Sequence, residues 1–140
     1  MTAQTQMPGK PFFDTNVLIY AIAQDDPRGE RAEALLSSGG VLSVQVLNEF
    51  ASVARRKLRM SWKDVNAALD SFGVLCPSPV PITIDTHQSA VKIAERYGYE
   101  IYDALIAAAA LQSGSATVYS EDLQDGQVIE GKLAIRNPFK

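Results

Sequence analysis

The sequence contains 140 residues, of which 46% are hydrophobic and 21% are charged, and its formal net charge is −3. These proportions are typical of a folded globular protein and exclude a disordered polyelectrolyte. A chain of this length usually forms one domain, so we expect residues 1–10 to be a flexible lead-in and residues 11–140 to be a single domain.

The apolar segments and the cysteine content exclude two further classes of protein. The longest apolar run, residues 104–111, is far shorter than the ~20 residues that cross a bilayer, and no secretory leader opens the sequence. We therefore expect a cytoplasmic protein without membrane contact. Cys76 is the only cysteine, which excludes an internal disulfide and a cysteine-rich zinc site. We expect the Cys76 side chain to be buried.

A strand that leads directly into a helix is predicted at the beginning of the domain. Residues 11–13 form a short apolar run, Asp14 follows it, and residues 17–22 continue with a helical pattern. After a turn, residues 28–38 place apolar side chains on one face of a second helix, which ends at Gly39. Asp14 is therefore expected at the carboxyl end of the first strand.

A hairpin of two helices is predicted in the next part of the sequence. Residues 41–43 suit a second short strand, and Ser43 suits the N-cap of a helix over residues 44–58. Residues 61–75 repeat the helical pattern with Ser61 as the N-cap residue.

Strands and helices alternate again after a proline-rich connector at residues 76–81. The predicted elements are a third strand at residues 82–84, a helix from a cap at Asp85 or Thr86 to Gly98, an apolar helix at 102–112, and strands at 116–119 and 133–138. Alternation of this kind favours a mainly parallel sheet with helices on both faces, an α/β fold with three α/β/α layers.

Four acidic residues lie at positions that such a fold brings to one edge of the sheet. Asp14 and Asp122 follow predicted strands, Asp103 opens the apolar helix, and Glu49 lies in the middle of a helix beside its apolar side. Ligands of open parallel sheets bind beyond the carboxyl ends of the strands, where these residues are expected to meet.

A cluster of carboxylates without histidine or cysteine is typical of a site for Mg²⁺ or Mn²⁺. Such ions activate water for phosphodiester hydrolysis, and clustered carboxylates need a cation to offset their repulsion. Three of the four also have a structural interpretation: Asp14 suits a helix cap, Asp103 suits a cap or a charge that complements the helix dipole, and Asp122 suits a turn. Only Glu49, in mid-helix, has no capping alternative.

Four segments resemble the motifs of PIN-domain nucleases, and they occur in that family's order. Residues 13–21 (Phe-Asp-Thr-Asn-Val-Leu-Ile-Tyr-Ala) resemble the opening motif, and residues 48–50 the helix with the family's glutamate. Residues 102–109 resemble the third acidic motif and residues 119–123 the fourth. The resemblance covers residues 12–137.

This resemblance implies a parallel five-stranded sheet and Mg²⁺- or Mn²⁺-dependent cleavage of RNA by an endoribonuclease. It implies that the catalytic and metal-binding residues are Asp14, Glu49, Asp103 and Asp122. It also implies supporting residues, which are Thr15, Asn16, Ser120 and, optionally, Asp125. The size is similar to VapC-type toxins of toxin–antitoxin pairs, which implies a homodimer whose partner is a small antitoxin with a tail that enters the site.

Basic residues are concentrated at the end of the third predicted helix. Five of the thirteen basic residues lie within nine positions, and these are Arg55, Arg56, Lys57, Arg59 and Lys63. They fit an RNA-phosphate patch, and they equally fit cations that complement the carboxyl end of a helix. We expect Trp62, beside them, to pack in the hairpin or at a dimer contact rather than to stack on a base. His87 is expected at the surface.

Two other functions are compatible with an acidic strand-end cluster. One is a Mg²⁺-dependent phosphoacceptor signalling domain, although such domains have no equivalent of Glu49. The other is a non-catalytic binding module whose acidic pocket captures an arginine of a partner. Metal-dependent cleavage of RNA by the free protein distinguishes the nuclease from both.

Overall fold

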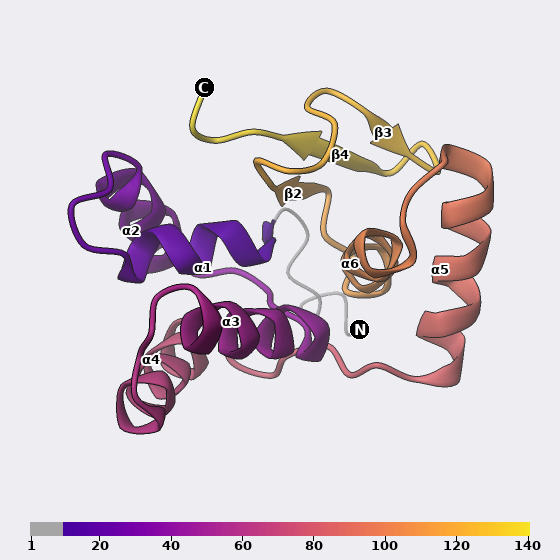
Figure 1. Cartoon of the computed structure of the whole chain (residues 1–140). Helices are drawn as coiled ribbons and strands as arrows, with labels where there is room; N and C mark the ends of the chain where they lie inside the picture. The colour runs from indigo at the N-terminus through magenta and orange to yellow at the C-terminus, as the bar shows by residue number, and fades with distance from the viewer. Residues whose placement is uncertain (1–9) are drawn as a thin grey trace, which may run out of the picture.

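The computed structural model describes residues 10–140, so the predicted lead-in lies outside the described residues except for Lys10. The elements, in chain order, are β1 (Phe12–Phe13), α1 (Thr15–Ile22), α2 (Gly29–Ser37), α3 (Val44–Arg56), α4 (Trp62–Leu75), α5 (Ile84–Tyr97), α6 (Ile101–Gln112), β2 (Thr117–Tyr119), β3 (Val128–Ile129) and β4 (Leu133–Arg136). Figure 1 shows their arrangement. Among the described residues, no helix has the length and apolar character needed to span a membrane.

The sheet contains four strands in the order β1-β2-β4-β3. Strands β1 and β2 pair in parallel, as do β2 and β4, whereas β3 runs antiparallel to β4. The mainly parallel sheet is confirmed, but the predicted number of five strands is wrong. Residues 41–43 make only isolated parallel bridges, from Val41 to Phe12 and from Ser43 to Val80. The chain enters α3 immediately after Ser43, so no run of pairs develops there.

The predicted strand at residues 82–84 is also wrong. Thr83 is the N-cap of α5, and its hydroxyl accepts the N–H of Thr86, while the Thr86 hydroxyl accepts the N–H of Thr83. This reciprocal capping box also corrects the expected cap at Asp85 or Thr86. Three consecutive β-branched residues are typical of a strand, but the capping hydrogen bonds start a helix there instead.

Strand β3 has no counterpart among the predicted elements. Its two residues pair with β4 across a tight turn in which Glu130 and Gly131 both have positive φ. A turn of this kind joins adjacent antiparallel strands. The short segment lacks the extended alternation by which strands are recognised in a sequence.

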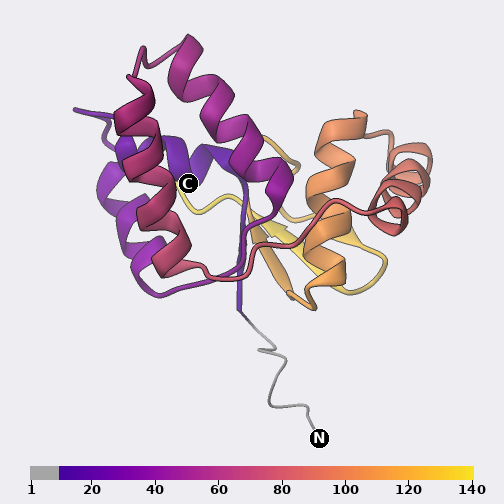
Figure 2. The same ribbon diagram turned by 90° about the horizontal axis from the view of Figure 1, so that it is seen from below.

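The helices lie in two groups with the sheet between them. Figure 2 shows α5 and α6 on one side and α1 to α4 grouped on the other, with the strands in the middle. This arrangement matches the predicted three layers. Helix α6 is buried on nearly all sides, since every residue from 104 to 110 is buried. Its almost wholly apolar sequence predicts this position.

A close backbone approach fixes the start of the domain against the segment before α3. The N–H of Phe13 donates to the carbonyl of Val41 at 3.0 Å, and the N–H of Val41 donates to the carbonyl of Pro11 at 2.8 Å. A Cβ atom on Gly40 would lie 2.4 Å from the ring of Phe13. Glycine is therefore required at position 40 for β1 to sit in its place.

Candidate active site

Asp14 lies at the junction between β1 and α1, as predicted. Its N–H donates to the carbonyl of Tyr119 at 3.0 Å, which continues the pairing of β1 with β2. Its side chain caps α1, because Oδ1 accepts the N–H of Thr15 at 2.7 Å. The capping interpretation of Asp14 is thus correct. The side chain is only 4% exposed, and its second oxygen faces another partner.

That partner is Ser120, whose hydroxyl joins the ends of β1 and β2. The buried hydroxyl donates to Oδ2 of Asp14 at 2.7 Å. It also accepts the N–H groups of Asp122 at 3.1 Å and Leu123 at 3.0 Å. One small side chain therefore orients the buried carboxylate and shapes the loop that carries Asp122.

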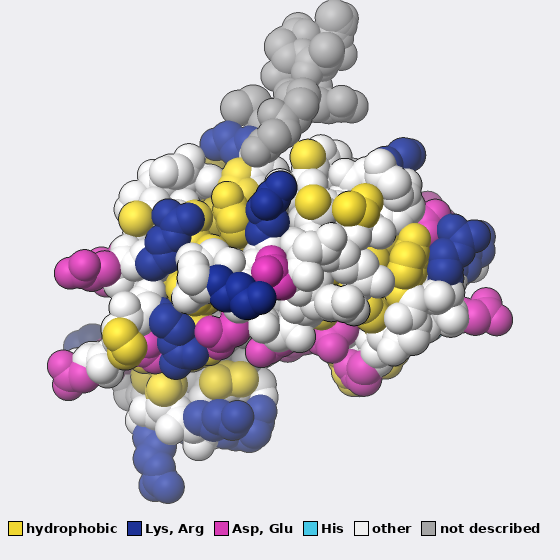
Figure 3. Space-filling view, turned by 90° about the horizontal axis from the view of Figure 1, so that it is seen from above, with side chains coloured by type: hydrophobic (Ala, Val, Ile, Leu, Met, Phe, Trp, Pro, Cys, Tyr) yellow, Lys and Arg dark blue, Asp and Glu magenta, His cyan; other side chains and the backbone are white. Residues whose placement is uncertain are grey.

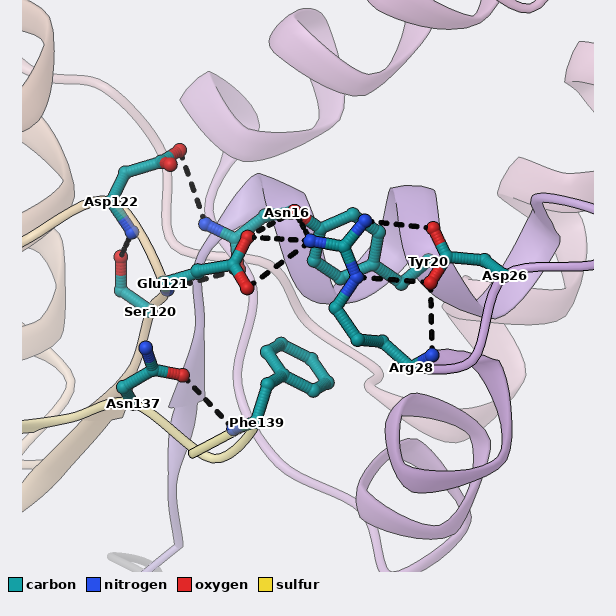
Figure 4. Close-up of polar contacts among 9 residues, drawn as sticks. All are labelled: Asn16, Tyr20, Asp26, Arg28, Ser120, Glu121, Asp122, Asn137 and Phe139. Atoms are coloured by element: carbon teal, nitrogen blue, oxygen red, sulfur yellow. Dashed lines mark hydrogen bonds and ion pairs between the residues drawn. The ribbon is translucent and has the colours of Figure 1, made fainter.

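Asn16 connects α1 to the same loop through both ends of its carboxamide. Nδ2 donates to Oδ2 of Asp122 at 3.2 Å, and Oδ1 accepts the N–H of Glu121 at 3.2 Å. Figure 4 shows the Asn16 side chain between these two neighbours. The loop after β2 is thus held to α1 by both a backbone group and a side chain.

Glu49 projects from the middle of α3 and reaches the start of α1. Its Oε1 accepts the hydroxyl of Thr15 at 3.0 Å, and its Oε2 accepts Nε2 of Gln45 at 2.7 Å. Thr15 directly follows Asp14, so this contact brings α3 to the acidic strand end. Sequence reasoning missed Gln45, although a glutamine four residues before a glutamate on one helix is a known signal for such a contact.

Asp103 lies in the first turn of α6 and is half-buried. The cap of this helix is Glu100, whose carboxylate accepts the N–H of Tyr102 at 3.0 Å. Asp103 therefore does not cap this helix, but its place in the first turn fits the alternative in which its charge complements the helix dipole. No hydrogen bond or ion pair joins the Asp103 carboxylate to another described residue, which leaves its oxygens available to a ligand.

The four carboxylates influence one another electrostatically. The pKa of Asp14 is raised to about 6, chiefly by burial; the hydrogen bonds from Ser120 and Thr15 oppose the rise, and the charges of Glu49 and Asp122 add a smaller part of it. Burial also raises the pKa of Asp103, and the charges of Glu100, Glu49 and Asp122 add to the effect. Four segments that are distant in sequence thus place their negative charges near one another.

No basic side chain among residues 10–140 forms an ion pair with any of these four carboxylates. Acidic side chains gather near the middle and the lower edge of the face in Figure 3, and Lys and Arg side chains lie beside them. Within the described part of the chain, no three acidic, histidine or cysteine side chains form a ready-made chelate for one ion.

A second charged network, centred on Arg28, was missed by sequence reasoning. The Arg28 guanidinium donates to both oxygens of Asp26 at 2.9 Å and to Oε1 of Glu121 at 3.0 Å. It lies 3.7 Å from the ring centroid of Tyr20, whose hydroxyl also bonds to Glu121. Figure 4 shows this arrangement, with the ring of Phe139 below it. Arg28 neutralises Glu121 and leaves its neighbour Asp122 without a basic partner.

Asp125 lies outside the cluster of four carboxylates. Its oxygens accept the N–H of Asn137 at 2.8 Å and Nζ of Lys140 at 3.3 Å. The groups that act on its pKa, which is lowered, are Asn137, Lys140 and Arg136, and none of the four carboxylates is among them. The contacts of Asp125 therefore indicate that it anchors the C-terminal segment.

The basic cluster extends from the last residues of α3, through the turn, to the start of α4. Trp62 is 59% exposed, so the expectation that it packs within this hairpin is wrong, and the alternative of a dimer contact stays a prediction. His87 is exposed and Cys76 is buried, as predicted.

Three solved bacterial structures share this fold. VapC20 of Mycobacterium tuberculosis, described as a sarcin-ricin loop cleaving toxin, is 22% identical; the match covers 80% of this chain and 89% of VapC20, with a TM-score of 0.66. DNA-bound VapBC of Salmonella typhimurium is 22% identical over 93% of this chain and 98% of its own, with a TM-score of 0.66. FitAcB of Neisseria gonorrhoeae is 24% identical; the match covers 91% of this chain and 97% of the FitAcB chain, with a TM-score of 0.64.

The family model of the PIN domain matches residues 12–124. A comparison with curated protein sequences finds no significant match. The likeness to these solved structures, at 22% to 24% identity, supports the fold. Because the PIN domain model matches well over half of the sequence, the chain belongs to the PIN domain family.

Proposed function

We propose that this protein is an endoribonuclease that hydrolyses RNA phosphodiester bonds with Mg²⁺ or Mn²⁺ held by Asp14, Glu49, Asp103 and Asp122. The observation that carries the proposal is the gathering of four carboxylates, from four separate segments, without a basic partner among the described residues. A cation offsets the repulsion that such a cluster generates. Membership of the PIN domain family and the description of VapC20 as a cleaving toxin both support this assignment.

The donor set fits a hard divalent cation. All four side chains offer carboxylate oxygens, which are the ligands that Mg²⁺ and Mn²⁺ prefer. Bound in such a site, a divalent ion lowers the pKa of a water molecule and stabilises the leaving oxygen of a phosphodiester. The half-buried Asp103 and the exposed Asp122 border the side from which RNA would approach, whereas Asp14 forms the buried base of the site.

The neighbouring polar residues would hold the carboxylates in place during the reaction. Ser120 and the N–H of Thr15 fix both oxygens of Asp14. The Thr15 hydroxyl and Gln45 fix Glu49, and Asn16 fixes Asp122. Because these contacts exist in the protein alone, little reorganisation would be needed when substrate binds.

We further propose that the chain is the toxin of a type II toxin–antitoxin pair in the cytoplasm. On this proposal it forms a homodimer and is inhibited by a small antitoxin. The matches to VapBC and FitAcB cover 97% to 98% of those chains, so this protein contains nearly all of the fold that is present in them. The carboxylates without basic partners offer a complementary surface for an arginine or lysine of an inhibitor.

The test is cleavage of RNA by the purified protein, with and without Mg²⁺. Asp14→Asn and Asp103→Asn remove one charge each from the cluster, and we expect both to lower the cleavage rate by at least about a hundredfold. Asp70→Asn makes the same chemical change on the exposed face of α4 and should leave the rate unchanged. Circular dichroism of each variant checks that folding is retained.

Two results would contradict the proposal. One is equal cleavage by Asp103→Asn and Asp70→Asn, which would separate the activity from the acidic cluster. The other is the absence of any Mg²⁺- or Mn²⁺-dependent cleavage by the wild-type protein, which would favour a module that only captures a basic side chain.

A further inference from the structure

The tip of the α3–α4 hairpin exposes an aromatic ring among basic side chains. Trp62 is the first residue of α4, and it precedes the buried residue Val65 by three positions and Leu69 by seven. This spacing places it on the packed face of the helix. Helix α3 nevertheless ends at Arg56, so the ring extends past the packed part of the hairpin and remains 59% exposed.

The exposed ring is held in place by an arginine of α3. The Arg55 guanidinium lies 4.7 Å from the centroid of the Trp62 ring, which is within the range of a cation–π contact. Nη1 of Arg55 also donates to the carbonyl of Met60 at 2.8 Å, so the guanidinium itself is fixed. A positioned indole ring in contact with an arginine is a platform on which another planar group can stack.

The other cations around Trp62 have no acidic partner among the described residues. Arg56 donates to the hydroxyl of Ser52 at 3.1 Å, and Lys57 and Lys63 are exposed without an ion pair to any described residue. The chain as a whole has a net charge of −3, so this positive cluster is a local feature. It is complementary to a polyanion.

Arg59, in the turn between the two helices, has a backbone conformation that glycine would adopt with less strain. Arg59 has φ of 56°, a left-handed conformation that costs a residue with a side chain about 1 kcal/mol. The Arg59 side chain is exposed and forms no ion pair with a described residue. The charge at this position therefore has no evident role in the stability of the fold.

Helix α3 connects this tip to the carboxylate cluster. Arg56 follows Glu49 by seven residues, which is two helical turns, so both project from the same face about 10 Å apart along the axis. Ser52, the hydrogen-bond partner of Arg56, lies on that face between them. A single strand of nucleic acid could follow this face from the tip to the acidic site.

We infer that the hairpin tip is a subsite for single-stranded RNA, in which a nucleobase stacks on Trp62 and the surrounding cations bind the adjacent phosphates. The combination of an aromatic platform with a basic groove is the general mode of binding for single-stranded nucleic acid. The inference rests on the proposed function, since it takes RNA as the substrate. It adds a base-binding residue that lies away from the carboxylates.

The test uses the intrinsic fluorescence of Trp62, which is the only tryptophan in the sequence. A short oligouridylate is added to the full-length protein in EDTA, so that no metal-dependent cleavage takes place. We expect saturable quenching with RNA, and no quenching with inorganic polyphosphate, which offers phosphates without bases. Fluorescence unchanged by saturating oligouridylate would overturn the inference.

Variants separate stacking from a loss of folding. We expect Trp62→Ala to weaken binding of fluorescently labelled oligouridylate about tenfold, and Trp62→Tyr to retain most of the affinity. Val74→Ala, which trims another exposed apolar side chain of α4, is the matched control and should leave affinity unchanged. Equal affinities for Trp62→Ala and Val74→Ala would overturn the inference.

The subsite and the nuclease can fail independently of each other. Quenching by RNA in a protein that never cleaves RNA would support the subsite and contradict the nuclease. Cleavage that depends on Asp14, with the same KM in Trp62→Ala and wild type, would support the nuclease and contradict the subsite.

Discussion

Replacing Asp14 with asparagine removes the most buried charge of the carboxylate cluster, and the pH dependence of folding stability should change with it. The pKa of Asp14 rises from 3.8 to about 6 in the folded protein. A tenfold difference in proton affinity corresponds to about 1.4 kcal/mol, so ionisation of Asp14 costs the folded state about 3 kcal/mol relative to the unfolded chain.

The direction of the effect follows from the raised pKa. Between pH 3.8 and about pH 6, the folded protein binds the Asp14 proton and the unfolded chain has lost it. The contribution of Asp14 to stability is therefore fully present below pH 3.8 and is lost as the pH rises through about 6. Divalent cations, if they bind as proposed, should restore stability above that pH by favouring the ionised form.

The assay is urea unfolding of the wild-type protein and Asp14→Asn in EDTA, between about pH 4 and pH 7. Carboxyl groups with lowered pKa values, such as Asp26 and Glu130, act in the opposite direction but are present in both proteins. Their contributions cancel when the unfolding free energies are subtracted. We expect the stability of the wild type relative to the variant to fall by about 3 kcal/mol up to pH 6 and then to stay level.

The variant also carries a penalty that does not depend on pH. The new amide group would face Oγ of Ser120, which already accepts two backbone N–H groups. This conflict costs about 1–3 kcal/mol at every pH and appears as a constant offset. A difference between the two proteins that is flat from pH 4 to pH 7 would refute the reasoning about the buried charge.

Three further substitutions test other parts of the structure. Ser120→Ala leaves two backbone N–H groups and one oxygen of Asp14 without their partner, so urea unfolding should show a loss of about 3 kcal/mol, and a loss below about 0.5 kcal/mol would contradict this. Gly40→Ala places Cβ against the ring of Phe13 and should cost about 2 kcal/mol by the same measurement; an unchanged stability would show that the contact can relax. Arg59→Asn should leave stability unchanged or slightly higher, because asparagine tolerates positive φ, while the salt dependence of RNA binding should decrease by about 0.7 in log–log slope; an unchanged slope would exclude a phosphate contact.

Local signals in the sequence were sufficient to predict most of the helices and the position of Asp14 at the end of the first strand. Ser43 and Ser61 cap their helices as predicted, because a cap depends on hydrogen bonds to residues only three positions away. Asp14 was predicted at the end of a strand because an apolar pair precedes it. These features depend on residues that are neighbours in the chain, and they can therefore be predicted from a single sequence.

Features that depend on residues far apart in the sequence could not be predicted in this way. The ion pair between Arg28 and Glu121 joins residues 93 positions apart, and no local signal in the sequence predicts it. The exposure of Trp62 similarly depends on where α3 ends relative to α4. Strand β3 is too short to show a pattern and forms only because β4 lies beside it.

The most direct test of the account is the position of a bound Mn²⁺ ion in crystals of the protein. Anomalous diffraction locates this ion independently of any assay of activity. We predict a peak bordered by the carboxylates of Asp14 and Asp103, with Glu49 and Asp122 around it, that disappears in Asp14→Asn. A peak only at Asp125 or at another surface carboxylate, with the cluster empty at saturating Mn²⁺, would contradict the account.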